Sequence, residues 1–201
     1  MNTITTTLTT EAVFSDDNLN RYLLKKTWNA ELPKMTIIML APSEAAGIEL
    51  DTTTQLVLNN ASRLGYGSVS IVNLFATLND FSFKKAENDD PHNLQVIVDA
   101  AQNADLIVYA PGVGKAKSKV FQQRQEQVLN ALTPYESKLN CLCNENGNAR
   151  LQHPLSPAVR VWSLSPLKIS ELITQTIPIE PKPEAKKKGR PKVTKKDTAD
   201  V

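Results

Sequence analysis

The chain has 201 residues, of which 41% are hydrophobic, 22% are charged and 5% are aromatic. This length suits one domain with extensions, and the composition suits a globular core built mainly from aliphatic side chains. The first ten residues lack the regions of a secretory signal, and the longest apolar run, residues 35–42, is far shorter than the roughly 20 residues of a membrane span. We therefore expect a cytoplasmic protein without membrane contact.

The net charge of +2 hides an uneven distribution along the chain. Residues 182–201 carry eight basic and three acidic side chains, a net charge of +5, which leaves −3 on the remainder. A basic end attached to a mildly acidic body is typical of proteins that contact nucleic acids. The tail, residues 178–201, is therefore expected to be disordered and to contact DNA.

Hydrophobic patterning predicts strands that alternate with helices. Residues 1–18 are polar and Thr-rich and are expected to form a flexible N-terminal segment, followed by a helical turn or an edge strand at 19–28. Further along, the pattern predicts strands at 35–40, 69–75, 105–110 and 139–142, and helices starting at Asp51 and spanning 93–104, 120–132 and 170–177. This alternation predicts a three-layer α/β domain over residues 19–177, with a parallel sheet between two helical layers.

In such sheets, binding sites lie beyond the carboxyl ends of the strands, so the loops after the four predicted strands are the candidates. Two of their side chains are unusual. Asn is uncommon in strands, and Asn73 offers a donor beside an acceptor, which suits the edge of a nucleobase; alternatively it caps a loop. His153 lies in a loop with two prolines, where it could be aimed at a developing oxyanion, or else it is a surface histidine in a turn.

The cysteines and histidines give no sign of a metal centre. Cys141 and Cys143 are one residue apart, which disfavours a disulfide, and the chain has no second pair for a zinc site. The two histidines, His92 and His153, are not accompanied by clustered carboxylates. We expect reduced thiols, no metal and no cofactor.

Several different short motifs follow one another in a defined order through residues 21–163. They are Arg21-Tyr22-Leu23-Leu24 with Trp28; Pro42-Ser43 with Asp51 and Thr53; Gly65-Tyr66-Gly67 with Val72-Asn73-Leu74-Phe75-Ala76; and Cys141-Leu142 with Asn146-Gly147 and His153-Pro154-Leu155. This ordered set resembles a bacterial family of domains of unknown function, number 1643. In its motif order that family is in turn similar to the uracil-DNA glycosylase superfamily.

The glycosylase resemblance implies a fold and a chemistry. A loop after the first strand would position the attacking water, Asn73 would read a base, and His153 would support the base as it leaves. The reaction implied is cleavage of the N-glycosidic bond of a flipped nucleotide. The candidate residues for binding a base or nucleotide are Pro42, Ser43, Asn73, Phe75 and His153.

The chain departs from the family pattern at two positions. The pattern has Asn where this chain has Ala41, and Trp-Gly where it has Pro111-Gly112. Alanine cannot position or activate a water. Asp51 is the nearby carboxylate that could substitute, although its position also suits the N-cap of a helix. With His153 and Asp51 as the candidate catalytic residues, the sequence favours weak or absent catalysis.

The basic tail contains Gly-Arg-Pro within a run of lysines. This resembles the AT-hook motif, whose extended core lies in the narrow minor groove of A·T-rich DNA while flanking lysines meet phosphates. Lys187 and Lys188 stand where the usual motif has Pro-Arg, which predicts weak binding. The candidate DNA-binding residues are Lys186, Lys187, Lys188, Gly189, Arg190, Pro191 and Lys192. The alternative is a disordered tail that only aids solubility.

Three functions fit these observations. The first is a DNA-associated accessory protein whose glycosylase-like domain binds a nucleotide or DNA with little or no catalysis, aided by the tail. The second is an N-glycosidase that acts on a modified base or nucleoside. The third is a protein-interaction module.

Overall fold

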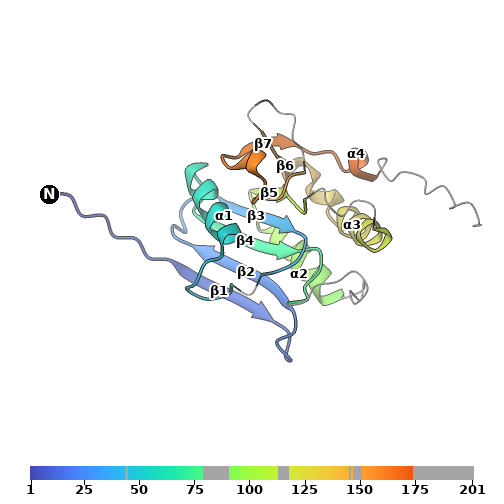
Figure 1. Cartoon of the computed structure of the whole chain (residues 1–201), viewed down its shortest axis with the longest axis horizontal. Helices are drawn as coiled ribbons and strands as arrows, with labels where there is room; N and C mark the ends of the chain where they lie inside the picture. Colours follow the sequence, from blue (N-terminus) through green and yellow to red (C-terminus); the bar gives the residue numbers. More distant parts are fainter. Residues whose placement is uncertain (44, 79–90, 113–117, 145, 147–150, 174–201) are drawn as a thin grey trace, which may run out of the picture.

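A mixed seven-stranded sheet forms the centre of the protein (Figure 1). The computed structural model describes residues 1–43, 45–78, 91–112, 118–144, 146 and 151–173. The strand order is β1-β2-β4-β3-β5-β6-β7. Strands β4, β3, β5 and β6 are parallel, whereas β1, β2 and β7 join the sheet through antiparallel pairs. The strands are β1 (Thr9–Phe14), β2 (Arg21–Thr27), β3 (Lys34–Met39), β4 (Ser68–Asn73), β5 (Leu106–Tyr109), β6 (Leu139–Cys143) and β7 (Ser163–Pro166).

Helices cover both faces of the sheet, because successive side chains of a strand point to opposite faces and both sets are apolar in the central strands. Ile37 and its strand neighbours pack against Val57 and Ala61 of α1 (Thr52–Arg63). Ile38 belongs to the opposite core cluster, which includes residues of α2 (Pro91–Gln102), α3 (Lys119–Ala131) and α4 (Ile169–Ile173). Two short 3₁₀ helices, Thr133–Lys138 and Pro157–Val159, complete the described elements.

The predicted three-layer α/β architecture is confirmed, but the prediction of a parallel sheet is wrong at both edges. Residues 9–14, which we expected to be part of a flexible segment, form the edge strand β1. Residues 21–27 form β2, an interior strand between β1 and β4 and not a helical turn or an edge strand. The hydrophobic pattern does not predict β1, because one half of the strand is exposed and none of it is fully buried. It does not predict β2 as an interior strand, because two of the buried side chains of β2, Arg21 and Lys26, are charged.

Three further observations concern the cysteines, the helices and the metal-ligating side chains of the described residues. Cys141 and Cys143 are buried on β6 and are not joined in a disulfide. No helix of the described residues is long and apolar enough to cross a membrane. Among the same residues, no three His, Cys, Asp or Glu side chains are grouped so that they could hold a metal ion.

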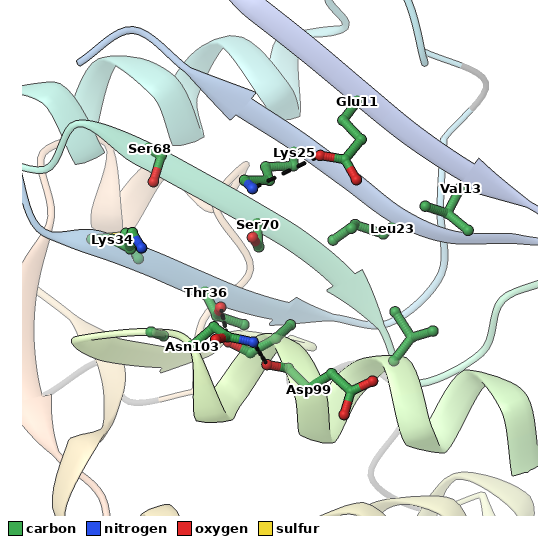
Figure 2. A pocket seen from close by; sticks show the side chains of 14 residues that line it. Glu11, Val13, Leu23, Lys25, Lys34, Thr36, Ser68, Ser70, Asp99 and Asn103 are labelled. Atoms are coloured by element: carbon green, nitrogen blue, oxygen red, sulfur yellow. Dashed lines mark hydrogen bonds and ion pairs between the residues drawn. The ribbon is translucent and has the colours of Figure 1, made fainter. Parts of the chain in front are cut away.

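A polar groove of about 470 Å³ lies between α2 and the open part of the sheet face (Figure 2). Its walls carry Lys25, which pairs with Glu11 at 3.8 Å, and Thr36, whose hydroxyl donates to the Ala100 carbonyl at 2.9 Å. Lys34 and Ser68 place the groove at the amino ends of β3 and β4. None of the site residues predicted from the sequence lines it.

Candidate functional site

The connections of the sheet diverge at the carboxyl end of β3, and we call this topological switch point the crevice. The chain leaves β3 toward α1 on one face, whereas it leaves the neighbouring strands β4 and β5 toward α2 and α3 on the other. Loops that diverge in this way leave a space beyond the strand ends, where ligands of open α/β sheets bind. Ala41–Ser43, Asn73 and Gly112 follow or end the three strands that border this crevice.

Asp51 closes the loop after β3 as the N-cap of α1, which confirms that part of the prediction. Its extended backbone lets Oδ1 accept a hydrogen bond from the Thr54 amide at 2.6 Å. Burial alone raises the pKa of the Asp51 carboxyl. Hydrogen bonds from Ser43 and Thr54, together with the charge of Arg21, outweigh this effect and hold the pKa below its usual value. Asp51 is therefore ionised at neutral pH.

Arg21 anchors the same loop from β2, and the sequence analysis did not select it as a site residue. Its Nη1 donates to the Ser43 carbonyl at 2.9 Å and also to the Ala45 carbonyl. The pairing of β1 with β2 passes from Val13–Leu23 to Phe14–Arg21, so Tyr22 is an extra residue in a bulge. Bulges re-aim side chains, and this one accompanies the turn of the Arg21 guanidinium toward the crevice loop.

Asn73 ends β4, and its side chain is 1% exposed. Neither its Oδ1 nor its Nδ2 has a hydrogen-bond partner among the described residues. A buried amide normally satisfies both atoms, because each unsatisfied group costs about 1–3 kcal/mol. An amide left open in this way indicates a group that is held ready for a partner from outside the fold, either a ligand or an ordered water.

Two helices on the far side of the sheet hold the backbone around Asn73 in place. Asn93, from α2, donates through Nδ2 to the carbonyls of Asn73 and Leu74, both at 3.2 Å. Arg124, a buried residue of α3, donates through Nε to the Leu74 carbonyl at 2.7 Å. Bonds from both helices to one short backbone segment limit its movement, so the Asn73 amide is positioned before any ligand arrives.

His153 lies half-buried in the loop after β6, next to the loop that follows β5. Its Nδ1 accepts the Leu155 amide hydrogen at 3.2 Å, which leaves the proton of the neutral ring on Nε2. Burial lowers the pKa of His153, and the charge of Asp51 offsets only part of that effect. Gly112, at φ +82°, leaves room for the His153 side chain, since a Cβ on residue 112 would lie 3.2 Å from the His153 Cβ. The imidazole is thus neutral at pH 7 and offers one N–H donor.

The structure brings some of the predicted residues together and separates others. Asp51 interacts electrostatically with both Arg21 and His153, and Ser43 is bonded to this group. Pro42 is half-buried in the same loop, whereas Phe75 lies in the core cluster on the α2 and α3 face. Residues 186–192 of the tail, together with residues 113–114 and 147, lie outside the described residues.

The sequence did not single out four residues that surround the candidate site: Arg21, Lys26, Asn93 and Arg124. All four are polar side chains that are at least nine-tenths buried. A sequence pattern treats Arg and Lys as surface residues, so burial of the charge hides them. The one available signal was the position of Arg21 at the start of the first family motif.

The fold and site define the class of protein: a three-layer α/β protein with a topological switch point at the carboxyl end of its parallel strands, beside which buried polar side chains lie. A family model described as "Protein of unknown function (DUF1643)" matches residues 21–155, and the chain belongs to that family. The matched region runs from the buried Arg21 to the loop of His153 and so includes the whole crevice. No curated protein matches the chain.

Proposed function

We propose that this protein is a DNA-associated accessory protein whose domain binds a nucleotide, or a nucleotide of DNA, with little or no catalysis. The observation that carries the proposal is the Asn73 amide, which is buried at the crevice, open at both polar atoms and held in place through its backbone. A donor beside an acceptor matches the hydrogen-bonding edge of a nucleobase. The resemblance of the motif order to uracil-DNA glycosylases supports the same reading.

Weak catalysis follows from the loop after β3. Ala41 stands where the related pattern has an amide, and its methyl group can neither donate nor accept a hydrogen bond. Asp51 Oδ1 already accepts from the Thr54 amide, whereas Oδ2 is buried without a hydrogen-bond partner among the described residues. The pKa of this carboxyl is held below its usual value, so Asp51 would be a weak base toward a water bound in the crevice.

The tail adds affinity for DNA in this proposal. Its Gly189-Arg190-Pro191 core would lie in the minor groove of A·T-rich DNA, with the lysines on either side at the phosphates. The prolines at 178, 181 and 183 favour an extended connection between the domain and this core.

Replacing Arg190 by glutamine in the full chain is expected to weaken binding to an A·T-rich duplex by about tenfold and to abolish its preference over a G·C-rich duplex. The matched control is Lys196→Gln, which removes the same charge from the same tail and should weaken binding to both duplexes slightly and equally. Fluorescence anisotropy over a salt series measures both effects. Equal losses in the two variants would reduce the tail to a nonspecific polycation. Absence of binding at low salt would favour a protein-interaction module.

A second candidate function, N-glycosidase activity, is favoured by the state of His153. A neutral imidazole that donates from Nε2 can stabilise the oxygen of a departing base as the C1′–N bond breaks and its electron pair moves to the base. A water molecule would then add to C1′, and the proton that it loses would end on the departing base anion. The ionised Asp51 nearby would favour positive charge developing on the sugar.

If the protein is an enzyme, His153→Ala is expected to lower base release by about a hundredfold or more. His92→Ala is the control, because His92 is the other histidine of the chain and lies exposed at the start of α2. The assay measures free base from DNAs and nucleosides that contain uracil or modified bases. Release that is absent from every substrate, or equal in the two variants, argues against this function.

A further inference from the structure

Arg21 is a buried cation without a close anionic partner. It is 2% exposed, and the groups that accept from its Nη1 are two backbone carbonyls, which carry no net charge. No carboxylate of the described residues lies within ion-pairing distance, and Asp51 acts on it only at longer range. Burial of an arginine is costly unless the charge is paired, and arginine keeps its charge at neutral pH.

A second buried cation lies on the same strand. Lys26 is 1% exposed and donates to the Thr10 hydroxyl at 2.8 Å and to the Gly47 carbonyl at 2.5 Å, which are again neutral acceptors. Burial lowers the pKa of Lys26, and the charge of Arg21 lowers it further. Within the described residues, Asp51 is a half-buried carboxylate whose charge acts on Arg21, whereas Glu49 of the same loop is exposed and screened by water. Among the described buried groups beside the crevice loop, positive charge is therefore in excess.

Three side chains of the site have buried polar atoms without partners among the described residues. Arg21 Nε lacks an acceptor, Asp51 Oδ2 lacks a donor, and Asn73 presents both a donor and an acceptor. The two residues lie on the adjacent strands β2 and β4, and the Arg21 amide donates to the Ala76 carbonyl at 2.9 Å just beyond the end of β4. A hollow of about 650 Å³ lies along residues 45–51, the loop that both buried cations hold.

We propose that Arg21 binds the anionic phosphate of the ligand, so that the site takes a nucleotide in preference to the corresponding nucleoside or free base. Guanidinium groups suit phosphate because their N–H donors match its oxygens and the interaction is charge-assisted. The phosphate would complement the excess positive charge, while the Asn73 amide meets the base. This inference rests on the proposed nucleotide-binding function and names Arg21 as the residue that determines specificity.

The test compares each of the common deoxynucleoside 5′-monophosphates, and deoxyuridine 5′-monophosphate, with its own nucleoside on the full chain. Isothermal titration and thermal unfolding measure binding, with inorganic phosphate and a short single-stranded oligonucleotide as further probes. We expect at least one monophosphate to bind about ten- to a hundredfold more tightly than its nucleoside. If the oligonucleotide binds at the crevice and the monophosphates do not, the phosphate that Arg21 binds is part of a DNA strand. If the monophosphates bind and the oligonucleotide does not, the ligand is a free nucleotide.

Arg21→Gln should reduce the ratio between monophosphate and nucleoside to about one, and Arg21→Lys should restore part of it. The control is Lys25→Gln, which removes a cation from the same strand in the separate polar groove. The ratio of the affinities for monophosphate and nucleoside in the unaltered protein tests the proposal even if the Arg21 variants fold poorly. Equal affinities for monophosphates and nucleosides would overturn the role of Arg21 and leave nucleoside or base binding standing. No binding of any base-containing probe at the crevice would overturn the nucleotide-binding function itself.

Discussion

Replacing Asn73 by leucine is expected to raise the free energy of unfolding by about 1–3 kcal/mol. Leucine has nearly the shape of asparagine but no polar atoms, so the substitution removes two buried groups that lack partners in the described structure. The same variant should lose nucleotide binding, because the base edge would face a methyl surface. Urea denaturation of the ligand-free protein measures the gain, and titration with nucleotides measures the loss.

Asn60→Leu provides a matched control for this result. Asn60 is also buried, but its Nδ2 donates to the carbonyls of Leu56 and Arg160, and its Oδ1 accepts the Trp162 amide hydrogen at 3.0 Å. The same change here should lower the free energy of unfolding by about 1–3 kcal/mol, since it leaves buried backbone groups unpaired. A loss of stability at both positions would mean that ordered water already satisfies Asn73, and the argument for an open amide would fail.

Replacing Gly67 by alanine is expected to lower the free energy of unfolding by about 3 kcal/mol or more. A Cβ at this position would lie 1.9 Å from the Asn29 carbonyl oxygen and 2.7 Å from the Leu32 Cβ. The backbone cannot move away easily, because Gly67 donates to the Pro33 carbonyl and accepts from the amides of Trp28 and Asn29. These bonds fix the approach of the chain to β3 and β4, the two strands that lead to the crevice.

The comparison for Gly67 is Gly47→Ala, where a new Cβ would meet nothing within 4 Å. Both changes are chemically identical and add one methyl group to a loop glycine. Gly47→Ala should change the free energy of unfolding by no more than about 0.5 kcal/mol in urea denaturation. Similar effects in the two variants would show that the clash at Gly67 is relieved by a small shift of the 29–32 segment.

Local sequence determined the elements whose signal lies within a few residues. The central parallel strands were predictable because β-branched and apolar side chains run without interruption through residues 35–39 and are interrupted only by Ser70 in residues 69–72. The N-cap at Asp51 was predictable because an acceptor side chain before a helical pattern satisfies the free amides of the first turn. Asn73 and His153 could be selected because they are unusual residue types at strand ends and in proline-rich loops.

Tertiary structure decided the features that depend on partners far along the chain. β1 is a strand because β2 pairs with it, and β2 is interior because β4 covers its other edge; neither fact is present in residues 9–27 alone. Arg21 and Lys26 are buried because the loop after β3 offers them carbonyls, and Arg124 reaches Leu74 across 50 positions of sequence. Sequence thus named the amide and the imidazole of the candidate site, while only the fold showed the buried cations beside them, because burial of charge is a property of the surroundings and not of the residue.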